Sequence, residues 1–319
     1  MKLYNDDCFN IFSKIKDKSI DLIILDLPYG QTACDWDVLI DLNKMWVEIK
    51  RIILDKGQIV FFCTTKFGYS LINSNPSWFR YDLIWKKSHS VGFLSANKKP
   101  LVQHEMIYIF SRDNSENDTE IKYNLELREY SKLIYKFINK SKKTINEDLG
   151  HEKAEHFFRF NSSQYQLCTN ETYNDLIKHY KINEMKGFKK YDLLKMDKTY
   201  NPQKTKGKPY IIKNKGKIKI YNAKVYDSIN ETGDRHPLSI LEFNNDKKAI
   251  HQTQKPIKLL EWIIKTYSNE KDLILDFTMG SGSCAIACIN TNRDFIGVEK
   301  DKKIYDMAEN RINAHLNTV

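Results

Sequence analysis

Residues Ile20 to Gly30 read Ile-Asp-Leu-Ile-Ile-Leu-Asp-Leu-Pro-Tyr-Gly, a short apolar run that ends at an acid, a proline and an aromatic ring. A run of this length and composition predicts a buried β-strand. In open α/β sheets the carboxyl ends of the strands face the ligand crevice, so we expect Asp26 and Tyr29 to face a substrate. Pro28 stiffens the turn between them. The segment from Asp26 to Tyr29 therefore predicts an active-site loop.

A second strand, followed by a glycine turn, lies near the other end of the sequence. Lys271 to Ser283 reads Lys-Asp-Leu-Ile-Leu-Asp-Phe-Thr-Met-Gly-Ser-Gly-Ser, and residues 284–290 then read as a helix. Asp276 stands at the expected end of the strand. Gly280 and Gly282 allow a ligand to approach the backbone closely.

The residues beyond this turn indicate which ligand it holds. Glu299, 23 residues after Asp276, closes a short strand expected over residues 295–298. An acid in this place commonly binds a ribose hydroxyl. Ala285 stands where the dinucleotide fingerprint has its third glycine, so there is no sign of a pyrophosphate cradle. An adenosine-type ligand such as S-adenosylmethionine fits the pattern better than NAD.

Together these patterns predict an α/β fold with a doubly wound, mostly parallel, Rossmann-like sheet. We expect helices over residues 39–54 and 257–267, and further strands over 57–65, 81–86 and 105–111. The last two strands are expected to form an antiparallel edge. A length of 319 residues permits one large domain or two.

The charge of the chain is concentrated in its middle part. The net charge is +10, and residues 114–235 hold 25 Lys plus Arg against 17 Asp plus Glu, so they supply +8 of it. Between Gln203 and Tyr226 there are eight lysines, three interleaved tyrosines and no acid. This composition predicts a surface that contacts phosphates. A membrane footprint, or a solvated lysine-rich loop, is the alternative reading.

Other classes of protein find little support in the sequence. The first residues run into Asn5-Asp6-Asp7 without the apolar stretch of a signal peptide, and we expect no membrane span and a cytoplasmic protein. The six cysteines form no Cys-x-x-Cys pair and read as reduced core residues. No second cluster accompanies His151 and His156, so we expect no metal site.

Three blocks in a fixed order carry a family resemblance. Residues 26–29 match an Asp-Pro-Pro-Tyr signature with Leu27 in place of the first proline, and residues 276–282 match a loop written Asp-Pro-Phe-x-Gly-Ser-Gly. Before that loop, residues 251–256 resemble a His-Pro-Thr-Gln-Lys-Pro element. The sequence thus resembles the amino-methylating DNA methyltransferases, in the permuted order where the catalytic block precedes the cofactor block. The members carried by phages and prophages are the most similar in character.

The resemblance implies roles for particular residues. It implies S-adenosylmethionine as cofactor, with Asp7 near the adenine because Asn5-Asp6-Asp7-Cys8 looks like the N-terminal strand of the family. The catalytic residues would be Asp26, Leu27, Pro28 and Tyr29. The cofactor-binding residues would be Asp7, Thr253, Lys255, Asp276, Phe277, Thr278, Gly280, Ser281, Gly282 and Glu299. Taken singly, Asp26 could instead be a turn residue, Tyr29 a core ring and Glu299 a surface acid.

We expect the chain to be organised as an interrupted core. Residues 1–112 would form its catalytic part, 113–235 an inserted basic target-recognition region, and 236–319 its cofactor-binding part. In the insert, residues 123–140 read as a helix, and residues 144–160 could form a helix-turn-helix or part of an ordinary helical bundle. The expected partner is double-stranded DNA, with a homodimer and a cognate restriction endonuclease as further candidates.

The predicted activity is transfer of a methyl group from S-adenosylmethionine to the N6 amino group of an adenine flipped out of duplex DNA. Cytosine also presents an amino group, so methylation of cytosine N4 is an alternative. An RNA or protein methyltransferase on the same core is another. A non-catalytic DNA-binding protein that retains the scaffold is the alternative from a different class, and the acids at 26, 276 and 299 argue against it.

Overall fold

A computed structural model describes residues 1–30, 39–112, 118–162, 164–194, 199–213, 217–218, 223–224, 228–246 and 254–318. The chain forms two compact units, one made of residues 1–112 with 199–319 and the other of residues 113–198. We expected the inserted region to run from 113 to 235. Its first boundary coincides with that of the smaller unit, but residues 199–235 group with the larger one.

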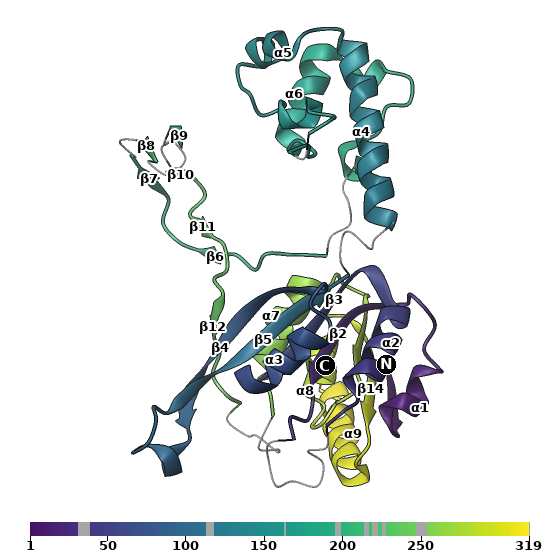
Figure 1. The fold of residues 1–319 in the computed structure, drawn as a ribbon, viewed down its shortest axis with the longest axis vertical. Coiled ribbons are helices and arrows are strands. Elements are labelled where there is room, and N and C mark those ends of the chain that lie inside the picture. Colours follow the sequence, from purple (N-terminus) through teal and green to yellow (C-terminus); the bar gives the residue numbers. More distant parts are fainter. Residues whose placement is uncertain are drawn as a thin grey trace. The chain divides into compact units, whose positions relative to one another are not determined.

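The larger unit is built on a sheet of eight strands in the order β1-β14-β13-β2-β3-β5-β4-β12 (Figure 1). All neighbouring strands run parallel except β5, which is antiparallel to both β3 and β4. The strands are β1 Lys2–Asn5, β2 Ile20–Asp26, β3 Ile53–Cys63, β4 Phe79–Val91, β5 Val102–Ser111, β12 Ile240–Glu242, β13 Leu273–Asp276 and β14 Asp294–Glu299. The predicted doubly wound, mostly parallel α/β fold is confirmed. The β4–β5 pair is antiparallel as predicted, but β12 and not this pair forms the edge of the sheet.

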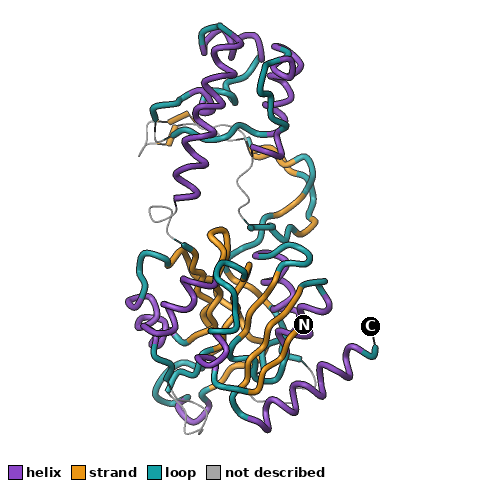
Figure 2. The backbone as a smooth tube through the Cα atoms, turned by 90° about the vertical axis from the view of Figure 1, so that its right-hand side faces the viewer, coloured by secondary structure: helices purple, strands orange, loops and turns teal. Residues whose placement is uncertain are grey.

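Helices cover both faces of the sheet (Figures 1 and 2). Side chains of β2 alternate between the faces, with Leu22 and Ile24 in one core and Ile23 and Leu25 in the other. Because both faces are buried, the strand reads as a continuous apolar run. The first core packs against α7 Ile257–Tyr267, α8 Ser283–Asn290 and α9 Lys302–Leu316, and the second against α1 Cys8–Phe12, α2 Leu42–Ile52 and α3 Thr65–Ser74.

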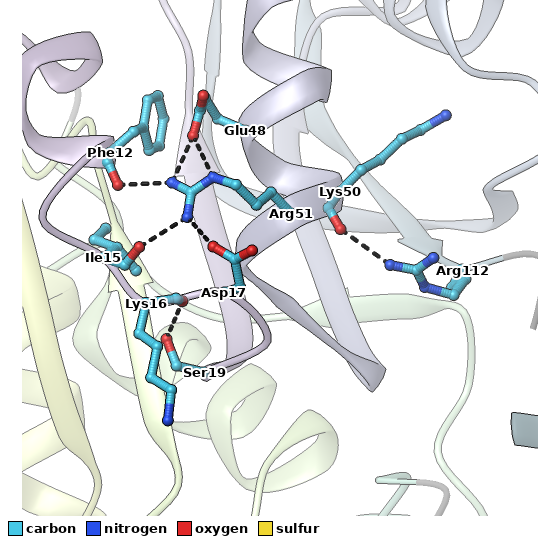
Figure 3. Close-up of polar contacts among 9 residues, drawn as sticks. All are labelled: Phe12, Ile15, Lys16, Asp17, Ser19, Glu48, Lys50, Arg51 and Arg112. Carbon is cyan, nitrogen blue, oxygen red and sulfur yellow. Dashed lines mark hydrogen bonds and ion pairs between the residues drawn. The ribbon is translucent and has the colours of Figure 1, made fainter.

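Arg51, in the last turn of α2, fixes the connection from α1 to β2 (Figure 3). Its guanidinium donates to the carbonyls of Phe12 at 2.7 Å and Ile15 at 2.9 Å, and pairs with Asp17 at 2.5 Å and Glu48 at 2.6 Å. A planar group with several donors suits this multiple bonding. The contacts hold the start of the strand that ends in the predicted active-site loop.

The smaller unit is helical and has its own apolar core. Its helices are α4 Asp118–Ile138, α5 Lys142–Leu149 and α6 Asn170–Tyr180, with short 3₁₀ turns at His156–Phe158, Ile182–Glu184 and Tyr191–Leu194. The core includes the fully buried rings of Phe157 and Tyr173. The helix-turn-helix reading of residues 144–160 is wrong, because the element after Gly150 is a 3₁₀ turn of three residues. The ordinary bundle describes this unit better.

Residues 199–246 of the larger unit contain short strands outside the main sheet. The pairs are β6 Thr205–Lys206 with β11 Asp234–Arg235, β7 Tyr210–Ile212 with β10 Ser228–Asn230, and β8 Lys217–Ile218 with β9 Ala223–Lys224, all antiparallel. The lysine-rich segment therefore has partly β structure where it is described. Lys204, Lys208 and Lys213 are exposed on it, whereas the predicted Lys215 and Lys219 lie outside the described residues.

Candidate active site

Acids stand at the carboxyl ends of neighbouring parallel strands and border one cavity. Asp26 ends β2, Asp276 ends β13 and Glu299 ends β14. A cavity of about 1000 Å³ opens along this edge. Among the predicted site residues it is lined by Asp7, Asp26, Leu27, Pro28, Tyr29, Lys255, Phe277, Thr278, Gly280 and Glu299. A smaller cavity of about 60 Å³ beside it is lined by Asp276 and Ser281 among others.

The Asp26 carboxylate is held from two sides and still borders the cavity. Oδ1 accepts a hydrogen bond from the Tyr29 hydroxyl at 2.8 Å, and Oδ2 pairs with Lys255 Nζ at 2.6 Å. The side chain of Asp26 is 28% exposed. Since each carboxylate oxygen has a second lone pair, Asp26 can accept a further hydrogen bond from a ligand. Leu27, by contrast, is 2% exposed and packs in the core.

Lys255 contacts the predicted catalytic acid as well as lining the cavity. It lies just before Pro256, the N-cap of α7, so the start of that helix carries it to the end of β2. Its ammonium lies 3.0 Å from Glu105, whose other oxygen is 2.7 Å from Lys87. Lys255 and Glu105 are 11% and 10% exposed. The site thus contains a row of alternating charges that sequence reasoning did not assemble.

The row of charges sets the protonation of its members. Burial raises the pKa of Asp26 and Glu105 adds to the rise, while Lys255 opposes it. Burial lowers the pKa of Lys255, but the two carboxylates outweigh it, so its pKa lies above the usual value. Burial also acts on Glu105, but Lys255 and Lys87 leave its pKa lowered. Lys255 is therefore an ammonium and Glu105 a carboxylate at neutral pH.

Glu105 could have been found from the sequence. It lies near the beginning of a strand that runs antiparallel to β3, with Met106 opposite Cys63, the last residue of β3. The beginning of an antiparallel strand lies at the same edge as the ends of its parallel neighbours. An acid at that position of the predicted strand 105–111 therefore belonged with the acids at the other strand ends.

The turn after β13 is organised by its own acid. Asp276 Oδ1 accepts hydrogen bonds from Thr278, from the backbone N–H at 3.0 Å and from the hydroxyl at 3.3 Å. Asp276 is 7% exposed, and burial raises its pKa to about 7, against the opposing hydrogen bonds from Thr278. Thr278 also accepts from the backbone N–H of Asp26 at 3.2 Å. This threonine joins the two predicted motifs directly.

Glu299 holds the same turn from the next strand. Its carboxylate accepts from the backbone N–H of Gly280 at 2.9 Å and of Asp301 at 2.8 Å. Burial raises its pKa, opposed by these hydrogen bonds. Asp7 lies nearby as the N-cap of α1, accepts from Phe9 N–H at 3.0 Å and pairs with Lys300 at 3.0 Å.

The two glycines of the turn have different surroundings. Gly280 has φ +51° and open space on its Cβ side apart from its own turn, so it leaves room at the cavity. Gly282 has φ +75°, and a Cβ there would lie 2.9 Å from the side chain of Ile312 in α9. Gly282 lines neither cavity, and its lack of a side chain serves the packing of α8 on α9. Thr253 lies outside the described residues.

The donor set suits an adenosine-type ligand. The carboxylates of Asp7 and Glu299 can accept hydrogen bonds from hydroxyl or ammonium groups, and Ile304 offers an apolar contact. The volume is at the upper end of the roughly 300 to 1,000 Å³ typical of small-molecule sites, enough for a ligand and a second reactant. Among the described residues, no His, Cys, Asp and Glu cluster is suited to a metal ion. No described helix is long and apolar enough to cross a bilayer. A doubly wound sheet with such a site defines a nucleoside-cofactor enzyme of the methyltransferase class.

Comparison with known proteins is consistent with this class. A family model described as DNA methylase, of the N6/N4 type, matches residues 20–310. The chain therefore belongs to this family, and its cofactor is S-adenosylmethionine. The resemblance inferred from the three sequence blocks is thereby confirmed at the level of the family.

Individual relatives give the extent of the similarity. The Type II methyltransferase M1.MboII of Moraxella bovis is 24% identical over 98% of this chain and 96% of its own length. M.HpaI of Haemophilus parainfluenzae is 35% identical over 30% of this chain, and the match spans about a third, 32%, of M.HpaI. The solved structure of a DNA modification methylase from Thermus thermophilus, TTHA0409, aligns with TM-score 0.50 and 13% identity over 100% of this chain and 97% of that one. That likeness shows the shared fold alone.

Proposed function

We propose that this protein transfers a methyl group from S-adenosylmethionine to the N6 amino group of an adenine flipped out of duplex DNA. The observation that carries the proposal is the Asp26 carboxylate, fixed by Tyr29 and Lys255 at a strand end and bordering the cavity that Glu299 also lines. A base inside a duplex cannot reach such a cavity, so the base must leave the stack.

The chemistry requires acceptors for the amino hydrogens. The lone pair of the amino nitrogen is delocalised into the ring, and acceptors on both hydrogens localise it for attack. Asp26 offers a carboxylate oxygen, and the backbone of Leu27 or Pro28 a carbonyl, at the wall of the cavity. Because they are fixed before the base arrives, they stabilise the positive charge that develops on the nitrogen without reorganising.

The surrounding residues keep Asp26 ready for this role. Burial and Glu105 raise its pKa, and the Lys255 ammonium opposes the loss of charge. The Tyr29 hydroxyl also donates to the carbonyl of Phe62 at 3.1 Å, so the hydroxyl fixes the ring beside the cavity. A fixed aromatic face can stack on a flipped base, a contact worth about 1 to 3 kcal/mol. When bound, S-adenosylmethionine supplies an electrophilic methyl group. The proton that leaves the amino group passes to Asp26 or to water.

Adenine is proposed over cytosine because of the loop sequence. An Asp at the first loop position, together with the Thr-Gln-Lys-Pro and Met-Gly-Ser-Gly elements, resembles the adenine branch of the family, whereas Ser is more usual at that position in enzymes that make N4-methylcytosine. Since the relatives M1.MboII and M.HpaI are named Type II methyltransferases, we further propose a cognate restriction endonuclease. The DNA substrate places the activity in the cytoplasm, and residues 113–235 are proposed to recognise the target, with a homodimer as one arrangement.

The test is to methylate duplex DNA with labelled S-adenosylmethionine, digest it to nucleosides and separate them by chromatography. Label that elutes with N6-methyladenine supports the proposal. Label that elutes with N4-methylcytosine would keep the amino-methyltransferase and overturn the choice of base.

A further inference from the structure

The hairpin of β4 and β5 carries two large apolar side chains in solvent at its tip. Phe93 is 82% exposed and Leu94 is 99% exposed. Figure 1 shows the hairpin extending beyond the neighbouring strands of the sheet. Single exposed apolar residues are common, but an adjacent aromatic and aliphatic pair at an apex indicates a contact with a partner.

The tip is a formed turn. Gly92, with φ +95°, lets the chain leave β4, and Phe93–Ser95 form a 3₁₀ turn. The Ser95 N–H donates to the Gly92 carbonyl at 2.9 Å, and the Ala96 N–H donates to the Phe93 carbonyl at 3.0 Å. Phe93 and Leu94 are thus presented by fixed backbone, which lowers the entropy cost of placing them in a partner.

The stem of the hairpin connects the tip to the active site. Val91 and Val102 pair across the stem, and both line the large cavity. One residue separates Val91 from Phe93. The apolar tip therefore adjoins the wall of the cavity that is proposed to receive the target base.

The charge of the hairpin suits a polyanion. Residues 83–104 contain four lysines and no acid. Two of them are engaged, Lys86 with Glu242 at 2.9 Å and Lys87 with Glu105 at 2.7 Å. The others, Lys98 and Lys99, are exposed on the return side of the tip, where they can face phosphates while the apolar pair faces the bases.

We propose that Phe93 and Leu94 form a wedge that enters the base stack of duplex DNA and occupies the space left by the target base. This inference rests on the proposed function. Apolar side chains such as Phe and Leu unstack base steps in this way in proteins that deform DNA. The wedge favours base opening because it replaces the stacking that the departing base gives up. A second copy of the chain is the weaker occupant, because two side chains on a narrow apex offer far less than the roughly 800 Å² per partner of a stable interface.

The experiment compares paired and pre-opened DNA. Once the methylated sequence has been located, two duplexes are made, one fully paired and one with an abasic site opposite the target base. Single-turnover methyl transfer is measured for the full chain and for Phe93→Ala/Leu94→Ala. The control is Val47→Ala/Tyr69→Ala, which removes one aliphatic and one aromatic side chain exposed by 66% and 71% on α2 and α3.

The wedge variant is expected to lose at least about tenfold in rate on paired DNA, a change equal to about 1.4 kcal/mol. On the abasic duplex, where no pair needs opening, the loss should be under about threefold, with S-adenosylmethionine affinity unchanged throughout. An equal loss on both duplexes, no loss on either, or a changed oligomeric state in solution would overturn the wedge. Absence of transfer by the unaltered chain would contradict the proposed function instead.

Discussion

Glu299 serves two purposes within one carboxylate. Its oxygens accept hydrogen bonds from the backbone of Gly280 and Asp301, and the same side chain lines the large cavity. An ionised carboxylate has about four acceptor sites, so two remain for the hydroxyls of a ribose. Glu299 thereby joins the shape of the glycine turn to the binding of the cofactor.

Replacement of Glu299 by Ala should weaken S-adenosylmethionine binding by roughly 1.5 to 3 kcal/mol, the scale of a hydrogen bond to a charged group. Glu299→Gln, which keeps an acceptor for one backbone N–H, should lose less. Isothermal calorimetry measures the affinities, and circular dichroism checks the fold. The matched control is Glu270→Ala, an exposed acid just before β13. Unchanged affinity in the folded Ala variant would remove Glu299 from the cofactor site.

Some site residues were predictable and others were not, for a definite reason. Asp26 and Glu299 follow from strand ends, which periodicity locates well. Lys255 was expected at the cofactor, but its ammonium pairs with Asp26 and Glu105. A motif gives the identity of a residue and its neighbours in the chain, but not the long-range partner that its side chain meets.

Among the elements, the turn that follows β13 combines packing with a titratable group. Asp276 is buried and satisfies the Thr278 N–H with one oxygen. Its pKa is 3.8 in the unfolded reference and about 7 in the fold. The folded state therefore holds the proton more tightly than the unfolded chain does. Stability is then greatest below the lower value and decreases as the pH rises toward the higher one.

We predict that the free energy of unfolding contributed by Asp276 falls between about pH 4 and pH 7, by roughly 4 kcal/mol at about 1.36 kcal/mol per pH unit. Asp276→Asn keeps an acceptor for Thr278 and cannot ionise, so this part of the pH dependence should vanish. Urea unfolding of both proteins at several pH values tests it. Parallel stability curves for the two proteins would show that Asp276 ionises normally in the fold.

The elements themselves differ in how far their sequence determined them. Helix α7 runs over residues 257–267 as predicted, because Pro256 and the amphipathic pattern mark it clearly. Strand β12, three residues long, was not predicted, since its pairing with β4 is what makes it a strand. Residues 156–158 turned out to be a 3₁₀ turn, because apolar spacing alone does not distinguish a helix from a turn buried in a bundle.

At the scale of the whole molecule, the chain separates into a helical unit and a sheet unit with separate cores. The composition change at residue 113 marked the first boundary correctly. The other boundary was not visible in the composition, because the lysine-rich residues after 199 group with the sheet unit. Charge reports a surface, whereas a unit is defined by its core.

The exposed lysines of residues 204–213 are expected to contact phosphates. Lys204, Lys208 and Lys213 changed together to Gln should weaken binding to every duplex, and should reduce the log-log salt slope by up to about 0.9 per lost contact. The control changes Lys2, Lys16 and Lys271, which are exposed near the starts of β1, β2 and β13, away from the cavity. Fluorescence anisotropy at several salt concentrations measures both. An unaltered slope would make the segment a solvated loop.

The central claim is that Asp26 acts on the amino group of the base and not on the cofactor. Single-turnover methyl transfer to duplex DNA by Asp26→Ala tests it most directly, with S-adenosylmethionine affinity measured by calorimetry on the same protein and Asp82→Ala, an exposed acid on β4, as control. The account predicts a rate lower by about a hundredfold or more, the cost of losing one preorganised partner, and a nearly unchanged affinity. Near-normal transfer by Asp26→Ala would contradict it.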